Sequence, residues 1–143
     1  MRANLAAVRR RIALAAERVG RDPDGVRLVA VSKTFSAAAV VAAYYAGQVE
    51  FGENRVQEAE GKVAAVAQAG APVHWHLIGH LQTNKARSAL QLFAMIESVD
   101  SVRLATALSN RASGTVPILL ELNVAGEPTK TGFSPGDLTG ALR

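Results

Sequence analysis

The chain has 143 residues, of which 49% are hydrophobic, and carries a formal net charge of +4. This length and apolar content are typical of one globular domain with enough chain to bury a core. The absence of cysteine excludes disulfides and thiolate metal sites and fits a reducing compartment. No apolar stretch reaches the length of a membrane span and the N-terminus does not resemble a secretory signal, so we expect a cytoplasmic protein without membrane contact.

The basic balance of the chain raises nucleic-acid binding as an alternative function. Basic residues gather in the first predicted helix, but its apolar stripe of Leu5, Val8, Ile12 and Val19 is that of an ordinary amphipathic helix. Aromatic residues make up only 5% of the chain and do not alternate with basic ones as stacking platforms do. We therefore expect no nucleic-acid partner, and the basic binding module stays an alternative.

Short apolar runs alternate with helical patterns along the chain. The first helix ends at Gly20, and a turn over 22–25 follows it. Strands are predicted at Val26–Ser32, Val49–Gly52, Val73–Ile78, Phe93–Glu97 and Val116–Val124, the last being the strongest. The helices between them are predicted at 36–46, 53–69, 84–90 and 100–112, and a further helix begins after Ser134. Strict alternation predicts an α/β fold, with a parallel sheet and its helices outside.

The strands recur about every 22 residues, a spacing that suits a compact (β/α)8 barrel of the TIM type. Five β/α units do not close such a barrel, and the last helical pattern has a clear start but no end signal. We therefore expect residues 1–143 to form a single domain, the front part of a longer barrel that is apparently truncated after Arg143. An open five-stranded sheet with a frayed final helix is the competing interpretation.

Lys33 is the most informative residue, because it directly follows the first predicted strand. Functional groups of a parallel barrel lie where its strands end. Apolar walls favour the uncharged form of an amine, which is the form that attacks a carbonyl to give a Schiff base. Three of the four lysines (Lys33, Lys85 and Lys130) lie in the segments that look least like ordinary amphipathic structure, which favours lysine chemistry there. A solvated lysine at a strand end is the alternative.

Polar residues also follow the other predicted strands, and we expect them to share one rim with Lys33. They include Asn54, the segments 79–85 and 98–101, and the loop 123–133. His74, His76 and His80 have the spacing of a possible zinc triad. The sequence shows no obvious carboxylate partners for them, so we predict no metal site, and His76 is better placed than His74 to contact a ligand in the mouth.

Five motifs occur in an order that matches a known family. They are Ala30–Thr34, Phe51–Glu58, His74–Lys85, Glu97–Ser101, and Leu122–Glu127 with Lys130–Phe133. Together they closely resemble the YggS/PROSC-like pyridoxal 5'-phosphate homeostasis proteins, whose single domain is similar to the barrel domain of alanine racemase. Any one motif alone would be weak; five in order are specific.

The resemblance implies roles for individual residues. Lys33 matches the family lysine that forms the internal aldimine with pyridoxal 5'-phosphate, and Asn54 and His76 match positions that line the cofactor ring. Lys130 matches a basic residue of the loop after the fifth strand, without an assigned role. Phe35 stands where many relatives carry a second lysine. The family segments that hold the cofactor phosphate and the pyridine nitrogen have no match in residues 1–143.

The resemblance implies a pyridoxal 5'-phosphate binding protein that takes part in intracellular vitamin B6 homeostasis. Such a protein holds the reactive aldehyde on Lys33 and buffers it or delivers it to apo-enzymes, and we expect no catalytic residue. The first alternative is a pyridoxal-phosphate-dependent amino-acid racemase or Schiff-base lyase of the same fold. A racemase similar to alanine racemase would need a second acid/base, which that enzyme takes from a separate domain.

Overall fold

The computed structural model describes residues 1–141, which form one five-stranded parallel sheet with the strand order β1-β2-β3-β4-β5. A doubly wound sheet reverses its strand order at a switch point, whereas here every strand pairs with the next one in the chain, as in a barrel. The strands are β1 (Ala30–Val31), β2 (Glu50–Glu53), β3 (His74–Leu77), β4 (Met95–Val99) and β5 (Ile118–Leu120).

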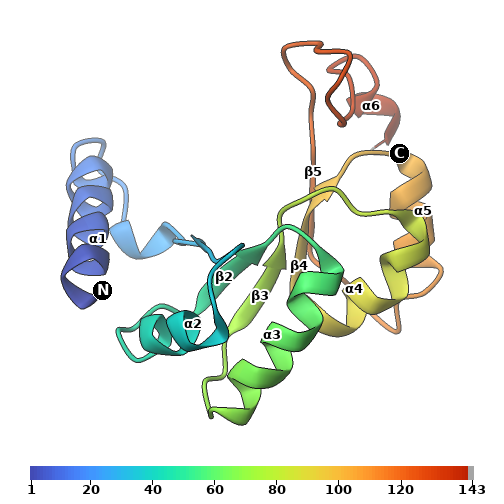
Figure 1. Cartoon of the computed structure of the whole chain (residues 1–143). Helices are drawn as coiled ribbons and strands as arrows, with labels where there is room; N and C mark the ends of the chain where they lie inside the picture. The colour runs from blue at the N-terminus through green and yellow to red at the C-terminus, as the bar shows by residue number, and fades with distance from the viewer. Residues whose placement is uncertain (142–143) are drawn as a thin grey trace.

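Helices cover one face of this sheet, as Figure 1 shows for α2 to α5. The helical elements are α1 (Arg2–Glu17), η1 (Pro23–Gly25), α2 (Ala37–Tyr44), α3 (Val56–Gln68), η2 (Thr83–Lys85), α4 (Ala86–Leu92), α5 (Val102–Ser109) and α6 (Leu138–Ala141). The core lies between the sheet and these helices, where Phe51, Leu77 and Ile96 meet Val40 and Leu104. Alternation along the strands therefore leaves every second side chain on the opposite face.

Local signals explain where the helices begin and end. The side chains of Ser36 and Ser101 accept hydrogen bonds from the backbone N–H groups of Ala39 and Leu104, which caps α2 and α5. The loop after α2 turns at Gly47, whose φ of +96° suits a glycine. The predicted alternation of strands and helices is correct throughout the described residues.

Several predicted boundaries are wrong, among them those of the fourth strand, which is Met95–Val99 and not Phe93–Glu97, and the end of the following helix, which is Ser109 and not 112. The first strand is only Ala30–Val31, since among described residues only these two pair with β2, while Leu28 instead accepts a hydrogen bond from the Gln48 side chain (2.7 Å). The fifth strand is the short β5, not 116–124. The helix predicted from Glu53 begins at Val56, because Glu53 is still paired in β2.

The sheet is open within residues 1–141, where β1 and β5 each pair with one neighbour. The chain thus contains five β/α units of a barrel without closing it. The loop after β5 rises above the carboxyl end of the strands (Figure 1). That end is the rim on which the predicted site residues were expected.

α1 stands beside the sheet and is attached through two of its basic residues. Arg2 donates a hydrogen bond to the carbonyl of Tyr45 (3.2 Å), and Arg9 donates to the carbonyl of Gly47 and the side chain of Gln48. Part of the basic surface of α1 therefore forms hydrogen bonds within the protein. None of the helices over residues 1–141 is both long and apolar enough to cross a bilayer.

Candidate functional site

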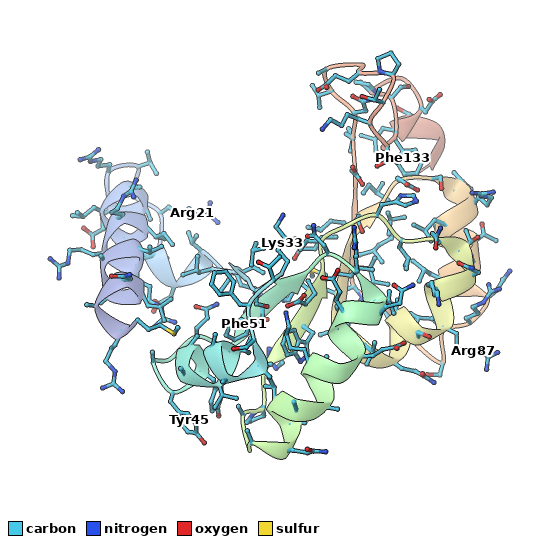
Figure 2. All side chains as sticks on the ribbon, in the orientation of Figure 1. Arg21, Lys33, Tyr45, Phe51, Arg87 and Phe133 are labelled. Atoms are coloured by element: carbon cyan, nitrogen blue, oxygen red, sulfur yellow. The ribbon has the colours of Figure 1, made fainter. Side chains whose placement is uncertain are left out.

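Lys33 lies in a tight turn at the carboxyl end of β1. The carbonyl of Ser32 accepts a hydrogen bond from the Phe35 N–H (3.0 Å), which closes the turn around Lys33 and Thr34. The Lys33 side chain is exposed and enters no ion pair or side-chain hydrogen bond with another residue of 1–141. Figure 2 shows it at the rim of the sheet. The amine is therefore accessible to a ligand that approaches this end.

Strand register places Lys33 and Asn54 at the rim and His76 below it. A row of paired residues crosses the sheet through Val31, Gly52 and His76. Lys33 and Asn54 each follow this row by two residues and lie just past the ends of β1 and β2, so both are at the rim. His76 lies about 7 Å deeper, because a strand rises about 3.3 Å per residue.

His76 is held between two carboxylates on the face opposite the helices. Its Nε2 lies 2.8 Å from Glu50 Oε2, and its Nδ1 lies 2.6 Å from Glu97 Oε1. The imidazole is only 2% exposed. Both ring nitrogens of His76 are therefore engaged by carboxylate oxygens. His74 adds a weaker contact to Glu50, at 3.2 Å.

These contacts also act on Glu50. Partial burial raises the pKa of this carboxyl, but the hydrogen bonds from His76 and His74 and the positive charges of both imidazoles outweigh burial. The pKa of Glu50 is therefore lowered from its ordinary value of 4.5. Arg27 is a more distant cation, with its Nε 4.0 Å from Glu50. The carboxylate is thus kept ionised beside His76.

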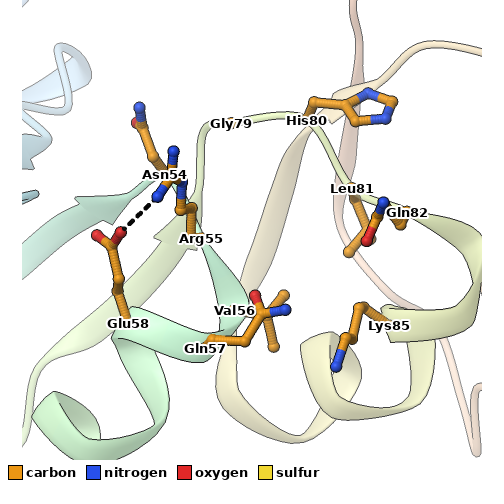
Figure 3. Close-up of a pocket in the computed structure, with 10 residues that line it drawn as sticks. All are labelled: Asn54, Arg55, Val56, Gln57, Glu58, Gly79, His80, Leu81, Gln82 and Lys85. Carbon is orange, nitrogen blue, oxygen red and sulfur yellow. Dashed lines mark hydrogen bonds and ion pairs between the residues drawn. The ribbon is translucent and has the colours of Figure 1, made fainter.

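Asn54 is placed by close packing between two strand ends. A Cβ at Gly79 would lie 2.4 Å from the carbonyl oxygen of Asn54, so only glycine permits this approach. Asn54 and Gly79 line a polar pocket of about 710 Å³, together with Arg55, Glu58, His80 and Lys85 among others (Figure 3). An ion pair of 3.1 Å between Arg55 and Glu58 lies on its wall. The amide of Asn54 is therefore anchored at the rim through its backbone.

A second rim pocket of about 570 Å³ opens between the loops after β3, β4 and β5. His80 lies on its wall and pairs with Asp100, with Nδ1 2.9 Å from Oδ2. Gly132 brings the β5 loop to the same pocket. Among the side chains of residues 1–141 there is no group of three or more that could hold a metal ion.

Lys130 and Phe35, to which no role is assigned, are both exposed. Lys130 lies on the β5 loop and lines neither rim pocket. Phe35 is 62% exposed and follows Lys33 by two residues, so no second amine is supplied from that position. The structure brings Lys33 and Asn54 to one rim and His76 beneath it.

Sequence reasoning missed two polar networks. The expectation that the histidines lack carboxylate partners is wrong, since Glu50, Glu97 and Asp100 contact them. A buried ion pair between Glu53 and Lys62 was also missed. Two sequence signals could have revealed these networks. Alternation along the strand puts Glu50 on the same face as Gly52, and helical periodicity puts Lys62 on the apolar stripe of its helix.

Known proteins resemble this chain in sequence and in fold. The sequence profile of the family described as alanine racemase, N-terminal domain, matches residues 3–143. The chain belongs to this family. An alanine racemase from E. faecalis shares the fold, with a TM-score of 0.62 at 18% identity over 96% of this chain and 37% of that one. The five units are thus part of the barrel of the alanine racemase N-terminal domain family.

Family members with higher sequence identity to this chain have names that state a function. A pyridoxal phosphate homeostasis protein of Pseudomonas aeruginosa is 46% identical over 138 residues, and one of Escherichia coli K12 is 40% identical over 139 residues. Each match covers 94% of this chain and 59% of the relative, so the chain spans about three fifths of their length. PipY of Synechococcus elongatus, solved with PLP bound, is 45% identical with a TM-score of 0.74, covering 92% of this chain and 62% of PipY.

Proposed function

We propose that this protein binds pyridoxal 5'-phosphate through Lys33 and takes part in intracellular vitamin B6 homeostasis. The observation that carries the proposal is the accessible amine of Lys33, presented on a closed turn at the barrel rim that also carries Asn54. The name of the Pseudomonas relative and the PLP-bound PipY structure support it. We also propose a cytoplasmic location, on the strength of the cysteine-free sequence.

The residues present fit the aldehyde and ring of this cofactor. Lys33 would hold the aldehyde end of the cofactor through its uncharged amine, and the two amine protons would leave with the carbonyl oxygen as water. Asn54 would orient the ring from the neighbouring strand end, and His76 would contact it from the row below. When bound, the cofactor supplies an electrophilic carbon that would otherwise react with any exposed amine.

The test is covalent trapping. Incubation with pyridoxal 5'-phosphate followed by borohydride should leave a pyridoxyl adduct on a peptide that contains Lys33. Lys33→Arg, which keeps the charge but cannot form the C=N bond, should abolish the adduct. A label found mainly on Lys62, Lys85 or Lys130 would refute the assignment.

We further propose a carrier rather than a dedicated enzyme. The relatives are named as homeostasis proteins, and the chain has no cysteine to act as an acid. Its two tyrosines, Tyr44 and Tyr45, lie where α2 ends, which is the helix end remote from the Lys33 turn. The racemase alternative gains support if alanine exchanges its α-proton stereospecifically, faster than with free cofactor, and only while Lys33 is present.

Delivery to apo-enzymes is the remaining part of the proposal. A cofactor held on the exposed Lys33 could pass to an incoming amine, because imine exchange needs access to the C=N carbon. We expect the loaded protein to activate a pyridoxal-dependent apo-enzyme faster than the same concentration of free cofactor does. Equal rates of activation would contradict direct delivery and leave storage as the function.

A further inference from the structure

A buried ion pair lies directly beneath the Lys33 turn. Glu53 at the end of β2 is fully buried, and its Oε1 lies 2.6 Å from the Nζ of Lys62, whose side chain is 11% exposed on α3. Both side chains lie on the helix-covered side of the sheet, next to the apolar core of Phe51 and Leu77. Their charges are therefore removed from water and compensate each other.

The pair holds the residue that precedes Lys33 at two points. Lys62 Nζ donates a hydrogen bond to the carbonyl of Ser32 (2.8 Å), and the hydroxyl of Ser32 donates to Glu53 Oε1 (2.6 Å). The Ser32 N–H is held as well, by the carbonyl of Gly52 (2.9 Å). Three independent contacts thus fix the backbone and the side chain from which the Lys33 turn starts.

The turn itself is strained. Thr34 has a φ of +67°, and among residues 1–141 it is the one residue other than glycine with a positive φ. A β-branched residue in the left-handed region is a genuine outlier, and such strain persists only where surrounding contacts determine it. The carbonyl of Ser32, which accepts from both Lys62 and Phe35, is the contact that closes the turn.

The ion pair is not explained by stability alone. Removing two charges from water costs free energy that the attraction between them repays only with good additional hydrogen bonds. Glu53 Oε2 is buried without a hydrogen-bond partner among the described residues, so this carboxylate is incompletely satisfied. Replacing a buried ion pair by apolar residues of similar volume is often neutral or stabilising, which points to a positional role for these charges.

We propose that Lys62 is a positioning residue for Lys33. Through the Ser32 carbonyl and through Glu53 it holds the strained turn in the conformation that presents the Lys33 amine at the rim. This inference rests on the proposed function, because it concerns the capture of the aldehyde by Lys33. It predicts slower covalent capture without Lys62, and little change in the non-covalent binding of the cofactor.

The experiment uses the full chain with the pair replaced as a unit, Glu53→Gln with Lys62→Met, since this leaves no lone buried charge. The rate of pyridoxal 5'-phosphate capture is followed by the visible absorbance of the Schiff base. We expect it to fall about ten- to a hundredfold, the effect of a small misplacement of a reacting group. Affinity for pyridoxamine 5'-phosphate, which has no aldehyde, should change less than about twofold, because the groups that bind it non-covalently are untouched.

Two further variants separate positioning from general stability. Lys62→Arg keeps a donor to the Ser32 carbonyl and should restore part of the rate. Thr34→Gly removes the strain, so replacing the ion pair in that background should slow capture much less than in the Thr34 chain. Glu60→Gln removes an exposed charge from the same helix and is the matched control, with an unchanged rate.

The outcomes are distinguishable. A wild-type chain that forms no adduct at Lys33 refutes the proposed function. A wild-type chain that forms it, with an unchanged capture rate in the pair variant, refutes the role of Lys62. Parallel losses of rate and of pyridoxamine 5'-phosphate affinity refute it too, since they indicate a merely structural role. If the pair variant does not fold, Ser32→Ala, which loses the hydroxyl contact to Glu53 and a longer one to the Gly52 carbonyl (3.5 Å), must slow capture, and an unchanged rate overturns the proposal.

Discussion

Two clusters of charged side chains lie on opposite faces of the same sheet, and they are built differently. On the helix-covered face, Glu53 and Lys62 form a sealed pair next to the core, so named because Glu53 is fully buried, although the Lys62 side chain is 11% exposed. On the other face, one imidazole, that of His76, lies between the carboxylates of Glu50 and Glu97. The side chains of these two carboxylates are 14% and 24% exposed, whereas that of Glu53 is fully buried.

This difference in exposure indicates two different roles for buried charges. A sealed pair cannot exchange its partner for water, so breaking it is costly and its geometry is fixed. A cluster at a partly open face can rehydrate its carboxylates, and its balance of charge changes with pH. We therefore expect the Glu53–Lys62 pair to control geometry and the His76 cluster to control the response to acid.

The largest effect should come from breaking the sealed pair. Lys62→Met leaves Glu53 charged and unpaired in the core, which should lower the free energy of unfolding by about 3–5 kcal/mol. Urea denaturation measures this loss. Adding Glu53→Gln to Lys62→Met should recover most of it, and a double variant as unstable as the single one would show that the pair is not an energetic unit.

A smaller loss should follow removal of the imidazole between the two carboxylates. His76→Leu removes two hydrogen bonds to charged groups, but Glu50 and Glu97 can partly rehydrate, so we expect a loss of about 2–3 kcal/mol. His80→Leu is the matched control, because its pair with Asp100 is half-exposed. Equal losses in the two variants would contradict the distinction between buried and exposed pairs.

The acid response should be smaller still and should belong to Glu50. Its pKa in the folded state is below the ordinary value of 4.5, so its contribution to stability is present above 4.5 and is lost as pH falls through the lower folded value. Glu50→Gln should cost about 1 kcal/mol at pH 7 and flatten the decline of stability in acid. The check is denaturation across this pH range, and a gap between the two proteins that persists in strong acid would refute the assignment.

The smallest effect concerns the strain above the sealed pair. Thr34→Gly should raise the free energy of unfolding by about 1 kcal/mol, because glycine adopts a positive φ without steric cost. Thermal denaturation with Thr34→Ala as the control measures this gain. A loss of stability on substitution by glycine would show that the turn is not strained.

The predictable parts of the molecule are those with local signals. Alternation of apolar runs, the cap at Ser36 and the glycine at 47 lie within a few residues of the features they determine, and the predicted order of elements was correct. The extents of β1 and β5 depend on pairing with neighbouring strands, which a single sequence does not reveal. The assignment of Glu53 to a helix was wrong for the same reason.

The candidate site likewise has a part that the sequence predicts and a part that depends on contacts between strands. The position of Lys33 at the rim followed from the rule that functional groups lie at strand ends, together with the family motifs. The carboxylates beside His76 come from residues 26 and 21 positions away on neighbouring strands, so proximity in sequence gives no hint of them. The roles of Lys33, Asn54 and His76 toward the cofactor stay predictions until trapping and affinity are measured.

The chain-ordered sheet has a consequence for biosynthesis. Every group that shapes the Lys33 turn, from β1 through β2 to the Lys62 side chain of α3, lies within residues 30–62. Contacts between segments so close in sequence close short loops and form quickly. A domain generally folds as a unit, but its N-terminal segments leave the ribosome first during synthesis. We therefore expect the contacts that shape the Lys33 turn to be among the first available to the nascent chain, and to become stable once the core strands that cover them are in place.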